Sequence, residues 1–67
     1  MTVSEQRKKL RQTINNMLNI FNDDYINTFV YEIKASILLT FAQEIGLISK
    51  KELLRYENNI RDKEPII

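Results

Sequence analysis

The fold is decided by residues 24–52, which read DYINTFVYEIKASILLTFAQEIGLISKKE. Apolar side chains recur every three or four residues over positions 24–45, which is the period of an α-helix. Gly46, the only glycine in the chain, follows and can adopt the left-handed conformation that ends a helix. Ser49 and Glu52 have the spacing of a capping box, in which each side chain accepts a hydrogen bond from the other residue's backbone N–H. The stretch therefore predicts a helix over 24–45, a turn, and a further helix from residue 50.

The helix over 24–45 is apolar around most of its circumference. One stripe consists of Ile26, Phe29, Val30, Ile33, Ile37 and Phe41. A second stripe consists of Tyr31, Ala35, Leu38, Ala42 and Ile45, while Leu39 falls within an otherwise polar arc. The two stripes together cover roughly two-thirds of the helix surface. A helix of this kind must be covered on several sides, so we expect it at the centre of the fold, with Ile33 and Ile37 in the core.

Two shorter helices flank this central one. The first is predicted over residues 3–21, because Thr2 and Glu5 form a capping box and apolar residues recur at helical spacing as far as Phe21. Asn22–Asp24 should end it and cap the central helix. The last helix is predicted over 50–62, and the tail 63–67, which contains Pro65, should fray.

These elements define one all-α domain over residues 1–67. Its predicted architecture is an antiparallel three-helix bundle, because short connections make successive helices antiparallel neighbours. A chain of 67 residues has a small core, and chains of this size usually need a further source of stability. The absence of cysteine excludes disulfides. The absence of both cysteine and histidine, the usual ligands of zinc, argues strongly against a zinc site. Unusually good helix packing and a partner subunit are the remaining sources of stability. We expect the second, and hence a dimer.

No stretch of the sequence predicts a membrane span or a signal peptide. No apolar run exceeds three residues, as in Ile37–Leu39, whereas a spanning helix needs about 20. The charged segment Met1–Arg11 lacks an apolar region behind it. We therefore expect a cytoplasmic protein. Separately, the abundance of Asn, Ile and Lys is typical of proteins encoded by an AT-rich bacterial or phage genome.

The composition also argues against catalysis. The chain contains no histidine, which is the commonest general base, and no cysteine, which is the strongest nucleophile. A single glycine cannot form a phosphate-binding loop. We expect no enzymatic activity, no metal, no cofactor and no small-molecule substrate.

The apolar surplus of the central helix instead predicts a protein interface. Two short helices can cover two of its three flanks, and an exposed apolar patch marks an interaction site. We predict that the partner interface consists of Tyr31, Leu38, Leu39, Ala42 and Ile45. The partner would be a second copy of the chain, another protein, or both.

Basic residues allow a second hypothesis, nucleic-acid binding. Arg7, Lys8, Lys9 and Arg11 lie in the first turns of a helix, where cations oppose the helix dipole, so they would suit a negatively charged partner. An ordinary solvated face is the alternative. Lys50, Lys51 and Arg55 at the start of the last helix interleave with acidic residues, which is also typical of a solvated helix.

The segment from Phe41 to Asn58 resembles the helix-turn-helix of the Cro/C1-type repressor family. Ala42, the turn residue Gly46, Ser49 and the run Arg55-Tyr56-Glu57-Asn58 occupy places comparable to those in that family. The resemblance implies a recognition helix in the DNA major groove, with Ser49, Lys50, Lys51 and Arg55 facing DNA. Arg7, Lys8 and Arg11 would add phosphate contacts. The alternative is an ordinary helical hairpin, in which Gly46 ends the first helix and Ser49 caps the start of the second.

The sequence thus favours a small helical interaction protein, either a homodimeric regulator or an accessory subunit of a larger assembly. The alternative is a small DNA-binding regulator. The apolar surplus supports the first hypothesis, and the basic residues support the second.

Overall fold

The computed structural model describes residues 1–21 and 25–67, with side chains described for 1–20 and 28–67. It contains three helices, α1 (Val3–Phe21), α2 (Tyr25–Glu44) and α3 (Lys50–Arg61), and no strand within the described ranges. The prediction of an all-α fold is confirmed, and the helix ends agree within one residue. The turn and cap expected at Asn22–Asp24 lie outside the described residues.

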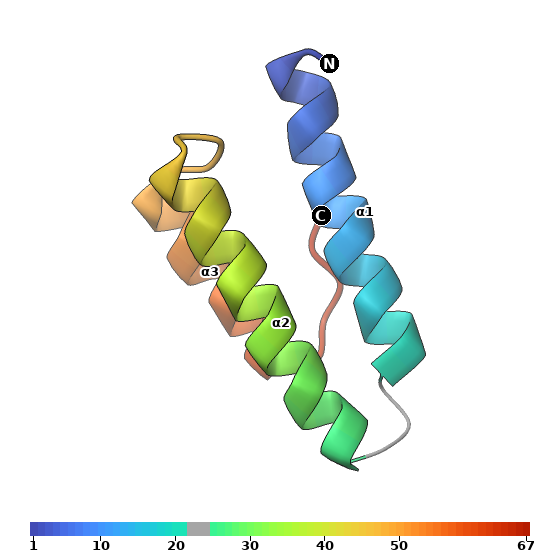
Figure 1. Ribbon diagram of the computed structural model, residues 1–67. Coiled ribbons are helices and arrows are strands. Elements are labelled where there is room, and N and C mark those ends of the chain that lie inside the picture. Colours follow the sequence, from blue (N-terminus) through green and yellow to red (C-terminus); the bar gives the residue numbers. More distant parts are fainter. Residues whose placement is uncertain (22–24) are drawn as a thin grey trace.

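Successive helices run antiparallel, and α2 lies between the other two (Figure 1). The backbone of α2 packs against both α1 and α3, whereas within the described residues the backbones of α1 and α3 do not approach each other. The chain after α3 turns back into the space between these two helices (Figure 1). The fold is therefore a three-helix arrangement that the C-terminal segment completes.

The helix ends follow their sequence signals closely. At the start of α1, the Glu5 N–H donates to Thr2 Oγ1 (3.1 Å) and the Thr2 N–H donates to Glu5 Oε1 (3.4 Å). After α2, Gly46 has a φ of 81°, its N–H donates to the Gln43 carbonyl, and the Leu47 N–H donates to the Ala42 carbonyl (2.9 Å). These two bonds form a Schellman motif, which satisfies the last carbonyls of a helix. The predicted glycine stop is thus confirmed.

A second Schellman motif ends α3, and its sequence signal is much weaker. Lys63 occupies the left-handed position with a φ of 59°. Its N–H donates to the Ile60 carbonyl (3.2 Å), and the Glu64 N–H donates to the Asn59 carbonyl (2.9 Å). Lys63 also forms an ion pair with Glu32 of α2. This turn directs the chain back toward α1.

The C-terminal segment is held in place, so the prediction of a frayed tail over 63–67 is wrong. Ile66 is 2% exposed and belongs to the core. The Asn15 side chain accepts a hydrogen bond from the Ile66 N–H (2.7 Å) and donates one to the Ile66 carbonyl (2.9 Å). The physical reason is that the Ile66 side chain is removed from water in the core while Asn15 satisfies both of its backbone groups.

One face of α2 supplies the centre of the core. The buried apolar residues are Leu10, Ile14 and Leu18 from α1, Tyr31, Ala35, Leu39 and Ala42 from α2, Ile48 from the turn, Tyr56 and Ile60 from α3, and Ile66 from the tail. Ile33 and Ile37, which we expected in the core, are 45% and 66% exposed. The face with Ala35 and Ala42 is the one that packs, because small side chains let neighbouring helices approach closely.

Candidate protein interface

The face of α2 opposite the core, with Ile45 directly after the helix, carries a continuous row of exposed apolar side chains. We call this row the apolar ridge; its members are Phe29, Ile33, Ile37, Phe41 and Ile45. Each member follows the previous one by four residues, so the side chains lie side by side along the helix. Their exposed fractions range from 45% to 66%, which leaves about half of each side chain in contact with water. The expected apolar surplus of the central helix is therefore present.

The ridge lies beside an apolar groove between α1 and α2. Met17 from α1 lines this groove together with Lys34, Ile37, Leu38 and Phe41 from α2, and its volume is about 390 Å³. Ile37 and Phe41 thus belong to both the ridge and the groove wall. Ile20, one turn beyond Met17 along the same side of α1, is also exposed.

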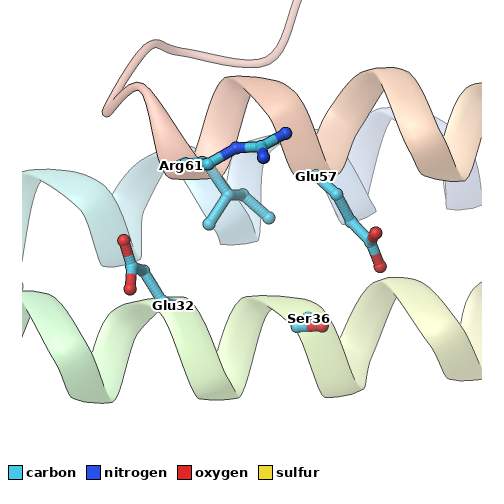
Figure 2. A pocket seen from close by; sticks show the side chains of 5 residues that line it. Glu32, Ser36, Glu57 and Arg61 are labelled. Atoms are coloured by element: carbon cyan, nitrogen blue, oxygen red, sulfur yellow. The ribbon is translucent and has the colours of Figure 1, made fainter.

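A polar groove lies between α2 and α3. Figure 2 shows the side chains that line it, Glu32 and Ser36 from α2 and Glu57 and Arg61 from α3. Its volume is about 320 Å³, and Ile60 forms its floor toward the core. The ridge is therefore adjacent to an apolar groove toward α1, while the surface toward α3 is polar.

Three of the five predicted interface residues lie on the buried face of α2. Tyr31, Leu39 and Ala42 are at most 2% exposed, so their assignment to an exposed partner surface is a mistake. They face α1 and α3 because this face, with its two alanines, packs most closely. Leu38 is partly buried on the groove wall, and Ile45 is exposed at the end of the ridge. The exposed apolar surface thus lies on the helix where the sequence predicts it. Phe29, Ile33, Ile37 and Phe41, which form most of the ridge, are absent from the predicted interface, and two of them, Ile33 and Ile37, are predicted in the core.

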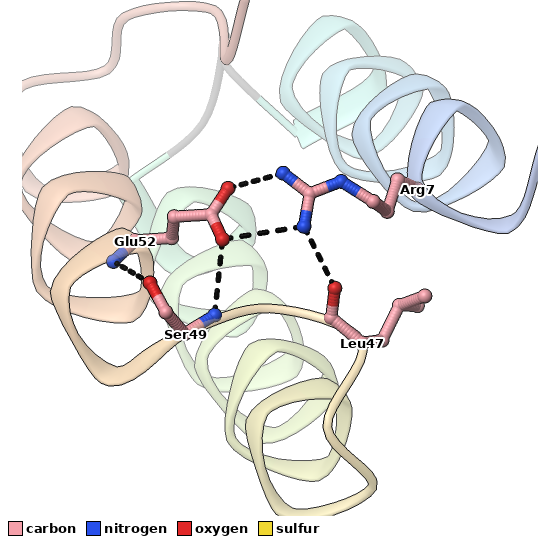
Figure 3. Close-up of polar contacts among 4 residues, drawn as sticks. All are labelled: Arg7, Leu47, Ser49 and Glu52. Carbon is pink, nitrogen blue, oxygen red and sulfur yellow. Dashed lines mark hydrogen bonds and ion pairs between the residues drawn. The ribbon is translucent and has the colours of Figure 1, made fainter. Parts of the chain in front are cut away.

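Arg7, one of the predicted nucleic-acid contacts, joins α1 to the turn and to α3. Its guanidinium donates to the Leu47 carbonyl (2.9 Å) and forms two hydrogen bonds with the carboxylate of Glu52 (Figure 3). Glu52 also accepts a hydrogen bond from the Ser49 N–H (3.0 Å), and its own N–H donates to Ser49 Oγ (3.1 Å). The capping box at the start of α3 is therefore confirmed, and it is coupled to α1.

Arg7 and Glu52 shift each other's pKa where α1 meets the start of α3. Hydrogen bonds from Arg7 and from the Ser49 backbone lower the pKa of Glu52 to about 2. Hydrogen bonding to Glu52 raises the pKa of Arg7 in turn. Glu52 thus keeps its negative charge in moderately acidic solution, and Arg7 serves as an internal partner.

The remaining predicted nucleic-acid contacts lie on the surface. Lys8, Ser49, Lys50, Lys51 and Arg55 are exposed, and Arg11 is half-buried. The Arg55 guanidinium lies 5.1 Å from the centre of the Tyr56 ring. Lys51 and Arg55 border a depression of about 540 Å³, which Glu52 and Asn58 complete. A cationic strip is therefore present on α3, and it includes one carboxylate.

The part of the chain that the structure describes contains no cluster of three or more His, Cys, Asp or Glu residues suited to a metal ion. Among the described helices, none combines the length and the apolar character needed to cross a membrane.

The described residues thus form a small three-helix protein in which the apolar ridge on α2 is exposed to water. Comparisons with protein-family models, curated proteins and solved structures give no match to this chain. The helix α3 runs back alongside α2 as a hairpin (Figure 1), whereas the two helices of a helix-turn-helix cross at about 90–120°. The resemblance to Cro/C1-type repressors stays a prediction.

Proposed function

We propose that this chain is a non-enzymatic interaction protein that binds another protein through its apolar ridge, as a homodimeric regulator or an accessory subunit in the cytoplasm. The observation that carries this proposal is the row of five large apolar side chains exposed on one face of α2. Half-exposed residues of this size leave roughly 500 Å² of apolar surface in one patch. The largest apolar patch on a typical monomer is about 300–600 Å² and is often functional.

The shape of the patch supports a protein as the ligand. Rows of apolar side chains four residues apart on one helix pack between the corresponding rows of another helix, so the exposed row on α2 suits a helix of a partner protein. The row includes two phenylalanines, Phe29 and Phe41, and aromatic side chains are enriched at interface cores. The grooves on either side of the ridge are open surface depressions, whereas small-molecule sites usually enclose most of their ligand.

The proposal is tested by capture with tagged protein and two matched variants. Ile37→Glu places a charge at the middle of the ridge, and Leu54→Glu makes the same change at a similarly exposed apolar position on α3 (58% against 66% exposed for Ile37). We expect the wild type and Leu54→Glu to retain a bound protein, either a differently tagged copy of the chain or another protein, and Ile37→Glu to lose it. Equal recovery with all three baits would contradict the proposal.

A second candidate function is DNA binding through α3. The exposed cations Lys50, Lys51 and Arg55 at the start of this helix favour it. The measurement is DNA affinity as a function of salt concentration, which should fall steeply if phosphates are contacted. Changing these three residues together to alanine should abolish binding while the helix content is retained, and unchanged binding would contradict this placement.

A further inference from the structure

We infer that the occupant of the apolar ridge is a second copy of this chain, which packs α2 against α2 about a two-fold axis. This inference rests on the proposed function, because it names the partner of the same surface. Three properties of the surface support it: its shape, its charge balance and its area.

The first property is self-complementarity of shape. A two-fold axis requires that one patch fit an identical patch. Here Ile37 and Phe41 project beside the apolar groove that they form with Met17, Lys34 and Leu38. When two such surfaces meet, the ridge of each copy can enter the groove of the other.

The second property is the charge balance of the exposed face. Among the residues whose side chains the structure describes, the ridge is interspersed with one cation, Lys34, and one anion, Glu44, both exposed. A face dominated by one sign of charge would repel an identical face, whereas a balanced face does not. The formal net charge of the whole chain is only +1, so long-range repulsion between copies is weak.

The third property is the area available. Roughly 500 Å² of apolar ridge on each copy gives about 1,000 Å² for two copies. Ile20 is 68% exposed beside the groove, and Met17 and Leu38 line it, so contacts there increase the total. Stable, specific interfaces begin near 1,200 Å² in total. The ridge alone falls short of this limit, and the ridge together with the groove residues reaches the lower end of the range.

The position of the axis follows from the ridge itself. Ile37 is the third of five ridge residues, so a symmetric dimer that buries the whole row brings Ile37 of one copy close to Ile37 of the other. This proximity can be measured cleanly, because the chain contains no cysteine and a single introduced thiol is unique.

The experiment uses purified full-length protein without other proteins. Ile37→Cys should cross-link with a short bismaleimide into a covalent dimer, and Leu54→Cys, an exposed control on α3, should cross-link at least tenfold less. The melting temperature of the wild type should rise with protein concentration, as mass action requires for an oligomer. Circular dichroism verifies that both cysteine variants keep the helix content of the wild type.

Two results would overturn the inference. One is a melting temperature independent of concentration together with equal cross-linking of the two cysteine variants. The other is association in which Ile37→Cys does not cross-link, which would place the contact on another surface. If the purified chain stays monomeric but capture of a foreign protein is still lost in Ile37→Glu, the proposed function stands and only the homodimer fails.

Discussion

The side-chain amide of Asn15 in α1 pairs with both backbone groups of Ile66, 51 residues later in the chain. This pairing holds the C-terminal segment between α1 and α3, where the Ile66 side chain is buried. Because the backbones of these two helices do not approach each other, the tail supplies the contact that a third helix interface would otherwise provide. The last residues are therefore part of the fold.

Asn15→Ala should destabilise the protein by about 1–3 kcal/mol, because two backbone groups of Ile66 lose their partner. Amide hydrogen exchange at Ile66 should accelerate more than exchange in α2. Asn16→Ala is the matched control, since Asn16 is exposed on the same helix and should cost less than about 0.5 kcal/mol. Equal effects of the two substitutions would show that the tail is not anchored in this manner.

Ionisation of Glu52 should make stability depend on acid pH. Its pKa is lowered from the ordinary value of 4.5 to about 2 in the folded protein. A lowered pKa in the folded state stabilises it above the unfolded pKa, and this contribution is lost as pH falls from about 4.5 toward 2. Urea midpoints measured across this window should therefore decline for the wild type more steeply than for Glu52→Gln. Glu57→Gln, which leaves the Arg7–Glu52 pair intact, should behave like the wild type, and parallel curves for all three proteins would refute the coupling.

The hydroxyl of Tyr31 is buried without a hydrogen-bond partner among the described residues. Burial, together with the nearby charge of Glu32, raises the pKa of Tyr31. Tyr31→Phe removes only the unpaired hydroxyl, so the free energy of unfolding should stay the same or increase. Tyr31→Ala should cost about 3–5 kcal/mol, because it leaves a cavity in the core. A loss above about 1 kcal/mol for Tyr31→Phe would show that the hydroxyl has a hydrogen-bond partner in solution.

The two faces of α2 should respond differently to truncation. Leu39→Ala should lower the free energy of unfolding by about 2–5 kcal/mol, since Leu39 is fully buried. Ile37→Ala should cost less than about 1 kcal/mol when measured on dilute protein, where the ridge faces water. Chemical denaturation of both variants at low micromolar concentration provides the comparison. Similar losses would mean that Ile37 is packed within a single copy.

The sequence predicted the helices well because their signals are local. Capping boxes at Thr2 and Ser49 and the stop at Gly46 depend only on neighbouring residues, and all three are confirmed. The choice between the two apolar stripes of α2 is a tertiary property. Both stripes have helical periodicity, and the sequence cue that separates them is the pair Ala35 and Ala42, whose small side chains permit close helix packing.

The anchored tail and the Arg7–Glu52 pair are also tertiary properties. The prediction of a frayed tail rests on Pro65 and on the position at the chain end. Its anchor, Asn15, lies 51 residues away and has no signature in the sequence. Arg7 was grouped with a basic cluster, although its partner Glu52 lies 45 residues later. Long-range pairs of this kind require the fold to be known first.

We propose that copies of this chain meet at the exposed face of α2. Sedimentation equilibrium of the purified wild type, Ile37→Glu and Leu54→Glu over a wide concentration range tests it most directly. We expect the wild type and Leu54→Glu to approach twice the chain mass of 8.0 kDa as concentration rises, and Ile37→Glu to remain at the monomer mass. A wild type that stays at the monomer mass throughout, or an Ile37→Glu variant that dimerises equally well, would contradict the claim.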